Sequence, residues 1–169
     1  MRTTTTRIRR LCAAACAAPL LVLAGAVGAG ATAAAPAPAS VPRALQASPS
    51  EILQLVNSER AKANCPALKE NAQLTKAAQT FADDASKHNL TNHTGSDGST
   101  VQQRIKDAGY NAGPTAENMS WGTTDAKQIV DGWLKSTKGH KETILNCSYT
   151  DTGVGVSGNY AVQVFASPG

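Results

Sequence analysis

Hydrophobic residues recur at helical spacing in the stretches that follow residue 48 and alternate with polar residues near the end of the chain. The first amphipathic stretch begins with Ser-Pro-Ser-Glu, in which Ser48 is placed to cap a helix, Pro49 takes its first position and Glu51 lies three residues after the cap. Ile52 and Val56 then lie one helical turn apart. The pattern predicts a helix at this point and a folded domain over residues 48–169.

Three later segments also favour helices. Residues 71–88 carry one apolar stripe that is rich in alanine, which indicates close packing against a neighbouring element. Ser99 or Thr100 can cap a short helix through Lys106 that stops at Gly109, and another helix fits residues 124–134. The segment "STKGHKETIL" predicts a further short helix. The stripe of the 71–88 helix consists of Leu74, Ala77, Ala78, Phe81, Ala82 and Ala85.

The end of the chain changes to the period of a strand. The segment "TGVGVSGNYAVQVFA" places β-rich runs on both sides of a Ser-Gly-Asn turn, which predicts a hairpin. A further strand is expected over residues 116–121, after a loop rich in Pro and Gly. Helices followed by a strand, more helices and a terminal hairpin predict a layered α+β domain.

The N-terminus predicts export. Four arginines precede an uncharged stretch over residues 11–30 and small-residue sites of the A-x-A type near residue 33, the order found in secretory signal peptides. Residues 1–33 are therefore expected to be a signal peptide and not a membrane span, with secretion into the medium. Residues 34–47, rich in Ala and Pro, are expected to be a mobile linker.

Removing this leader changes the electrostatic picture. Four of the sixteen basic residues leave with it, so twelve remain against twelve acidic residues. A formally neutral chain argues against nucleic acid or an anionic membrane as the main partner. We expect a monomer.

Two cysteines leave with the leader and Cys65 and Cys147 remain. In an oxidising compartment this pair predicts one disulfide, and two buried free thiols are the alternative.

Arg104 is expected to anchor the loop before Glu117. The two tryptophans, Trp121 and Trp133, either line a ligand groove or belong to the core.

Four separated motifs resemble one family. The segments "NHTGSDGST…RIKDAGY", "AENMSWG", "GHKETIL" and "TGVGV…YAVQVFA" are similar to the bacterial branch of the CAP superfamily, which comprises cysteine-rich secretory proteins, antigen 5 and pathogenesis-related proteins. The resemblance implies a three-layer α-β-α sandwich with a cleft that holds two histidines and two acidic residues. By motif these correspond to His93, Glu117 and His140, and Ser136 stands at the position where eukaryotic relatives have the second glutamate.

The resemblance also gives Glu117, the lone charge of its segment, a partner: it is expected to meet one or both imidazoles. Two neutral imidazoles and a carboxylate are a plausible ligand set for a divalent cation such as zinc or magnesium, although no cofactor is required. The alternative is that Glu117 simply ties a strand to two loops through hydrogen bonds.

These residues favour a binding protein over an enzyme. We expect a secreted module that binds a small apolar or lipid ligand, cell-envelope material or a partner protein. The rival hypothesis is a metal-assisted, protease-like hydrolase that uses His93, Glu117 and His140, and the serine at position 136 counts against it. A third is a stable scaffold whose surface loops carry the function.

Overall fold

The computed structural model describes residues 46–169, so the predicted signal peptide and most of the predicted linker lie outside the described residues. The described chain begins two residues before the predicted domain. The backbone N–H of Ala47 donates to the carbonyl of Thr124 at 2.7 Å, and the Gln46 side chain donates to the carbonyl of Gly158 at 2.9 Å. Residues 46 and 47 therefore belong structurally to the domain.

The described residues form five helices and four strands, in the order that the hydrophobic pattern predicts apart from one added short strand. The helices are α1 (Pro49–Lys62), α2 (Ala72–His88), α3 (Val101–Asp107), α4 (Ala126–Lys135) and α5 (His140–Ile144). The strands are β1 (Lys69–Glu70), β2 (Ala112–Trp121), β3 (Asp151–Ser157) and β4 (Tyr160–Pro168). None of these helices has the length and apolar composition that crossing a membrane requires.

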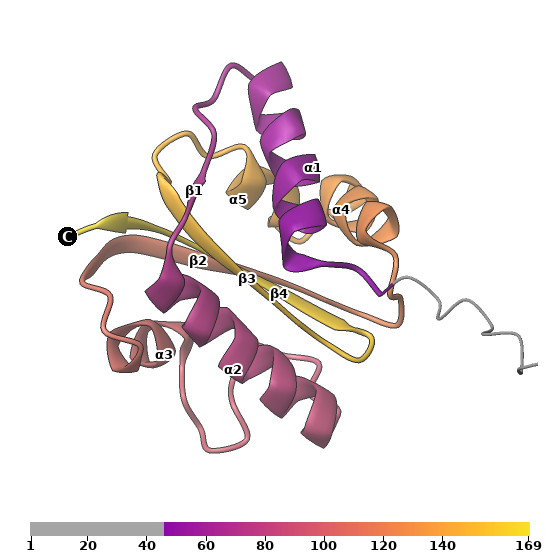
Figure 1. Cartoon of the computed structure of the whole chain (residues 1–169), viewed down its shortest axis with the longest axis vertical. Helices are drawn as coiled ribbons and strands as arrows, with labels where there is room; N and C mark the ends of the chain where they lie inside the picture. Colours follow the sequence, from indigo (N-terminus) through magenta and orange to yellow (C-terminus); the bar gives the residue numbers. More distant parts are fainter. Residues whose placement is uncertain (1–45) are drawn as a thin grey trace, which may run out of the picture. The chain divides into compact units, whose positions relative to one another are not determined.

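The strands form one sheet with the order β1-β3-β4-β2, in which β1 pairs in parallel with β3 and the other pairs are antiparallel. Figure 1 shows α1, α4 and α5 on one side of the sheet and α2 with α3 on the other. Each side has its own buried cluster, one centred on Trp133 and Phe165 and the other on Phe81 and Val162. The three-layer α-β-α sandwich predicted from the motifs is confirmed.

Helix α2 lies unusually close to β3. A Cβ atom on Gly153 would fall 2.0 Å from the backbone nitrogen of Thr75, and one on Gly155 would fall 2.4 Å from that of Gln79. On the helix side, Ala77 and Ala78 are buried, and their small side chains allow α2 to lie close to the sheet. The glycines of the "TGVGV" motif are therefore required by the contact between α2 and the sheet.

The predicted disulfide joins Cys65 to Cys147 and closes a loop across 82 positions of the chain. Beside it, the fully buried guanidinium of Arg60 donates to the carbonyls of Pro66, Ile144 and Tyr149. Together these contacts fix the segment that follows α5 against the end of α1. Cross-linking a loop of this length stabilises a fold by about 4 kcal/mol in the chain-entropy description.

Candidate functional site

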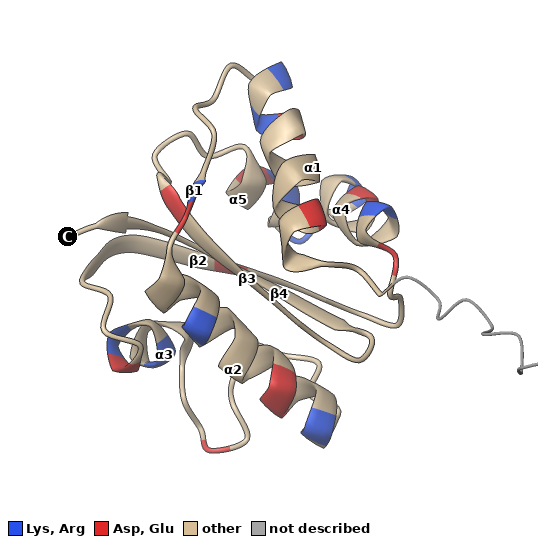
Figure 2. Ribbon diagram, in the orientation of Figure 1, with Lys and Arg blue, Asp and Glu red and all other residues tan. Residues whose placement is uncertain are grey.

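Strand β2 carries a single charged side chain, Glu117. In Figure 2 the colours of Lys, Arg, Asp and Glu lie mainly on the helices and loops, and the sheet is largely tan. Its side chain is only 1% exposed. His93 hydrogen-bonds through Nδ1 to Oε1 of Glu117 at 2.8 Å, and Arg104 donates from Nη2 to Oε2 at 2.9 Å and to Oε1 at 3.2 Å. The buried carboxylate is thus compensated by a cation and by an imidazole.

Arg104 is the centre of this arrangement. Helix α3 presents it because Thr100 and Gln103 form a capping box that fixes the start of the helix. The guanidinium donates to the carbonyls of Ser99 and His93 at 2.9 and 3.2 Å and stacks 3.7 Å above the ring of Phe81. Arg104 therefore anchors the loop that carries His93 as well as Glu117 itself, and not the loop before Glu117 as predicted.

His93 lies on the loop between α2 and α3, with 49% of its side chain exposed. Glu117 holds its Nδ1 atom, and Arg104 holds its backbone carbonyl, so the ring has a fixed orientation. The other ring nitrogen, Nε2, makes no hydrogen bond to residues 46–169. The expectation that Glu117 meets one imidazole is met by His93.

The second histidine is held by different partners. His140 is the first residue of α5, and its Nδ1 lies 2.8 Å from the hydroxyl oxygen of Ser136, at the end of α4. The side chain of Asn118 donates to the His140 carbonyl at 3.1 Å. Asn118 neighbours Glu117 on β2 but projects to the opposite face of the sheet, so consecutive residues of one strand position the two histidine segments.

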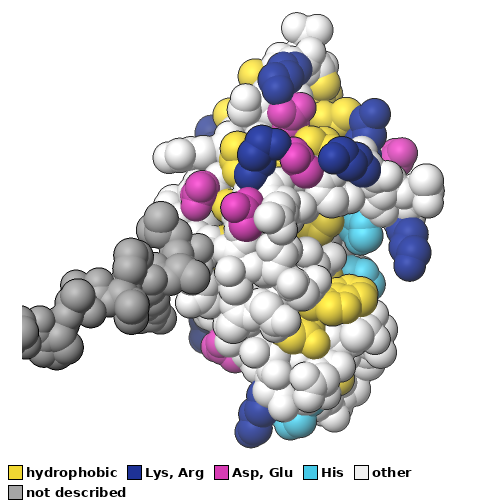
Figure 3. All heavy atoms as spheres, turned by 90° about the vertical axis from the view of Figure 1, so that its right-hand side faces the viewer, with side chains coloured by type: hydrophobic (Ala, Val, Ile, Leu, Met, Phe, Trp, Pro, Cys, Tyr) yellow, Lys and Arg dark blue, Asp and Glu magenta, His cyan; other side chains and the backbone are white. Residues whose placement is uncertain are grey.

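The surroundings of His140 disfavour its protonation. Burial lowers the pKa of His140, and the neighbouring charges of His93 and Lys138 lower it further, while Glu142 opposes them. The lowered pKa favours the neutral form of His140 at pH 7. Figure 3 shows two histidine side chains next to each other on one face of the domain, with hydrophobic side chains directly beside them.

The two tryptophans have different roles. Trp133 is buried and donates from Nε1 to the carbonyl of Met119 at 3.1 Å, so it belongs to the core. Trp121 ends β2 on the same face as Glu117 and is 48% exposed. Among residues 46–169, Trp121 is the one large hydrophobic residue whose side chain is exposed, so a ligand can reach it.

The side chains do not fit the divalent-cation site that the motifs imply. Both carboxylate oxygens of Glu117 are occupied by Arg104, and one also by His93. In the described part of the chain no group of three or more His, Cys, Asp or Glu side chains is arranged to hold a metal ion. Zinc sites normally have three protein ligands and magnesium prefers oxygen, whereas only two imidazole nitrogens remain available here.

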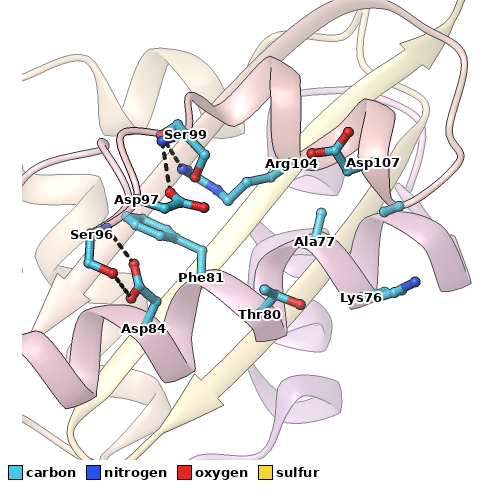
Figure 4. Close-up of a pocket in the computed structure, with 11 residues that line it drawn as sticks. Lys76, Ala77, Thr80, Phe81, Asp84, Ser96, Asp97, Ser99, Arg104 and Asp107 are labelled. Atoms are coloured by element: carbon cyan, nitrogen blue, oxygen red, sulfur yellow. Dashed lines mark hydrogen bonds between the residues drawn. The ribbon is translucent and has the colours of Figure 1, made fainter.

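A separate groove lies between α2 and α3, on the other side of Arg104. Its volume is about 320 Å³, and Figure 4 shows Asp84, Asp97 and Asp107 around it, with Phe81 and Arg104 in its wall. Ser96 and Ser99 satisfy two of these carboxylates by donating to Asp84 and Asp97. The groove shares Arg104, Phe81 and Ser99 with the surroundings of Glu117, whereas His93, Glu117 and His140 do not line it.

The model of the cysteine-rich secretory protein family, CAP, matches residues 53–167. The chain is a CAP-family protein. An extracellular protein of Bacillus anthracis that contains an SCP domain has a similar structure, with a TM-score of 0.67 and 27% identity over 69% of this chain and 39% of its own. An outer surface protein of Borrelia burgdorferi shares the fold at 23% identity, with a TM-score of 0.64 over 73% of this chain and 98% of its own.

Two curated relatives of this CAP-family protein come from Bacillus subtilis. The uncharacterized protein YkwD is 28% identical over 75% of this chain and 49% of its own length. The uncharacterized membrane protein YlbC is 29% identical over 70% of this chain and 34% of its own. The chain therefore spans between a third and a half of the length of these relatives.

Proposed function

We propose that this CAP-family protein is a secreted, extracellular binding module and that its ligand is cell-envelope material. The ligand contacts the surface that carries His93 and His140, here called the histidine face. One observation carries the proposal: each imidazole is held at Nδ1, by Glu117 or by Ser136, while Nε2 has no hydrogen-bond partner among residues 46–169 and can contact a ligand. A small number of polar groups held in fixed positions is typical of binding sites.

The geometry supports binding over turnover. A general base needs a position from which it can take a proton, and the Glu117 carboxylate is occupied by Arg104 and His93. The metal-assisted hydrolase also requires a water activated by a metal with open coordination positions. His93, Glu117 and His140 do not form a set of three metal ligands in the described residues. The rival hypothesis therefore lacks the metal site on which it depends.

The shape of the site favours envelope material over an enclosed lipid. A site that encloses a small apolar molecule typically has a volume of roughly 300–1,000 Å³. None of the three pockets described in residues 46–169 is lined by His93, His140 or Trp121. An open face of this kind suits one side of an extended polymer.

Secretion is supported by three independent features. The N-terminal segment has the order of a signal peptide, and Cys65 and Cys147 form a disulfide of the kind that persists outside the cytosol. The similar proteins of Bacillus anthracis and Borrelia burgdorferi are described as extracellular and as an outer surface protein.

Co-sedimentation with insoluble bacterial cell walls tests the proposal. The purified protein is expected to pellet with the walls, and the double variant His93→Ala, His140→Ala is expected to stay in the supernatant. His88→Ala is the matched control, because His88 is also an exposed histidine but is hydrogen-bonded to Asp84 away from this face. Equal pelleting of wild type and double variant would refute the site, and release of soluble wall fragments would favour the hydrolase.

A further inference from the structure

Resting on the proposed function, we infer that the envelope ligand is an extended peptide segment of a surface protein, which adds as a further strand to the outer edge of β2. Strand β2 ends the sheet order β1-β3-β4-β2, so one of its sides has no neighbouring strand in the described part of the chain. An open strand edge presents N–H and C=O groups with which another extended chain can pair.

The register with β4 shows which backbone groups of β2 point outward. The N–H of Gly122 donates to the carbonyl of Asn159 at 3.1 Å, next to the antiparallel ladder between the two strands. Antiparallel pairing directs the backbone groups of every second residue to the same side. The groups of residues 116, 118 and 120 therefore point to β4, and those of Thr115 and Glu117 point away from the sheet.

The middle of this edge is open, whereas its two ends are not. Met119 is buried and its carbonyl accepts from Nε1 of Trp133 at 3.1 Å, so α4 covers the edge beyond residue 118. At the other end, a register irregularity between Ala112 and Thr115 interrupts the pairing. Between these ends, the outward N–H and C=O groups of Thr115 and Glu117 have no hydrogen-bond partner among residues 46–169.

The backbone of Glu117 is accessible although its side chain is not. The side chain is 1% exposed, whereas the residue as a whole is only partly buried. The accessible atoms are therefore those of the peptide unit. Thr115 is also partly exposed, and it lines a pocket of about 270 Å³ between α3 and β2 together with Gln102 and Tyr110. This polar pocket adjoins the open edge and can receive a side chain of the added strand.

The two histidine segments lie on opposite faces of the sheet at this edge. The side chain of Glu117 projects to the face of α2 and α3, where it binds His93. The side chain of Asn118 projects to the other face, where it binds the carbonyl of His140. Side chains of an added strand also alternate between the two faces, so successive residues of the peptide would point toward the two histidine segments in turn.

The hydrogen bonds of His93 indicate which side chains suit this peptide. A carboxylate only accepts, so Nδ1 of His93 carries the proton shared with Glu117, and Nε2 of the neutral ring is an acceptor. A hydroxyl group supplies the matching donor. A hydroxyl can also donate to or accept from Nε2 of His140, whichever tautomer its contact with Ser136 favours. The peptide that fits best is therefore uncharged and rich in Ser and Thr.

Hydrogen exchange followed by NMR tests the open edge in the protein alone. The amides of Thr115 and Glu117 are expected to exchange at least about tenfold faster than those at positions 116 and 118, which bond to β4. If the amide of Glu117 exchanges as slowly as its neighbours, the edge is covered and the inference is overturned.

Titration with the blocked peptide Thr-Ser-Thr-Ser-Thr then tests strand addition. The peptide is expected to bind with a dissociation constant of about 1 mM and to shift the amides of Thr115 and Glu117. Its analogue methylated at every amide nitrogen has no backbone donor and is expected not to bind. Thr115→Pro removes one outward N–H without breaking the ladder and is expected to bind about fivefold more weakly. Thr115→Val keeps that N–H and is the matched control, expected to bind within about twofold of wild type.

The outcomes separate this inference from the proposed function. If cell walls bind through His93 and His140 but the peptide does not bind at about 10 mM, strand addition is wrong and the binding module stands. If the peptide binds but the walls do not, the proposed function is refuted and strand addition stands. If the methylated analogue binds as tightly as the parent peptide, backbone pairing is refuted. If the protein sediments as a dimer that Thr115→Pro disrupts, the edge pairs with a second copy and the inference is overturned.

Discussion

Replacement of Arg104 by methionine tests whether this residue holds the candidate site together. The side chain is 8% exposed and its partner Glu117 is 1% exposed, so the substitution leaves a carboxylate buried without its cation. Breaking such a pair costs about 3–5 kcal/mol, a large part of the roughly 5–15 kcal/mol that stabilises a typical domain. The variant also loses the donors to the carbonyls of Ser99 and His93.

Urea unfolding followed by far-ultraviolet circular dichroism, with the disulfide intact, measures this loss. With a urea dependence of about 2 kcal/mol per molar, a loss of about 4 kcal/mol lowers the midpoint by about 2 M. Lys127→Met is the matched control, because Lys127 pairs with Asp131 at 2.6 Å on an exposed surface and its loss leaves the midpoint almost unchanged.

The double variant Arg104→Met, Glu117→Gln makes the test specific. Glutamine removes the unpaired charge, so this variant is expected to be more stable than Arg104→Met alone by about 2 kcal/mol. If Arg104→Met unfolds within about 1 kcal/mol of wild type, or if the glutamine gives no recovery, the buried pair does not stabilise the site as argued.

Three further predictions concern the sheet, the imidazoles and the metal. Gly153→Ala is expected to lower the thermal midpoint by several degrees, because its Cβ would meet the backbone of α2, and an unchanged midpoint in calorimetry would contradict the close contact. His140 is expected to titrate by NMR below the ordinary histidine pKa of about 6.5. Because the folded state disfavours its protonation, the free energy of unfolding is expected to decrease as the pH falls below that value. A measured pKa above about 6.5 would refute the burial argument. Native mass spectrometry with stoichiometric zinc is expected to show no tightly held ion, and one zinc retained by wild type but lost from His93→Ala, His140→Ala would show that the two imidazoles suffice.

Local sequence signals predicted most of the fold. The start of α1 follows from side-chain capping, and the structure shows the Ser48 hydroxyl accepting from the Glu51 N–H at 3.1 Å. The terminal hairpin follows from alternation and a turn, and β3 and β4 pair as predicted. Capping, periodicity and turn chemistry depend on residues close in sequence, so they can be identified without the tertiary structure.

Two features of the sheet could not be predicted in this way. Strand β1 consists of two exposed residues and exists only because it pairs with β3. Strand β2 begins at Ala112, four residues earlier than predicted, and includes Pro114, which indicates a loop when the sequence is considered alone. The sheet order places β2 at an edge, where proline is tolerated because one side of the strand needs no partner.

The candidate site was predicted in part. The motifs identified His93, Glu117, His140 and Ser136, and the structure joins the first two and the last two by hydrogen bonds. They did not identify Arg104 as the cation that meets Glu117, because the pair links a helix to a strand and no local spacing encodes it. The sequence did contain one signal for this pair, because Arg104 precedes the apolar Ile105 in a short helix and both are buried. A guanidinium on the inner face of a helix needs a hydrogen-bond acceptor such as a carboxylate.

Chemical-shift mapping by NMR tests the central claim most directly. The labelled protein would be titrated with soluble fragments of bacterial cell wall, and the perturbed amide and indole signals would be placed on the structure. The proposed function predicts shifts that cluster at His93 and His140. Shifts confined to the groove between α2 and α3, or no shifts at saturating fragment concentrations, would contradict it.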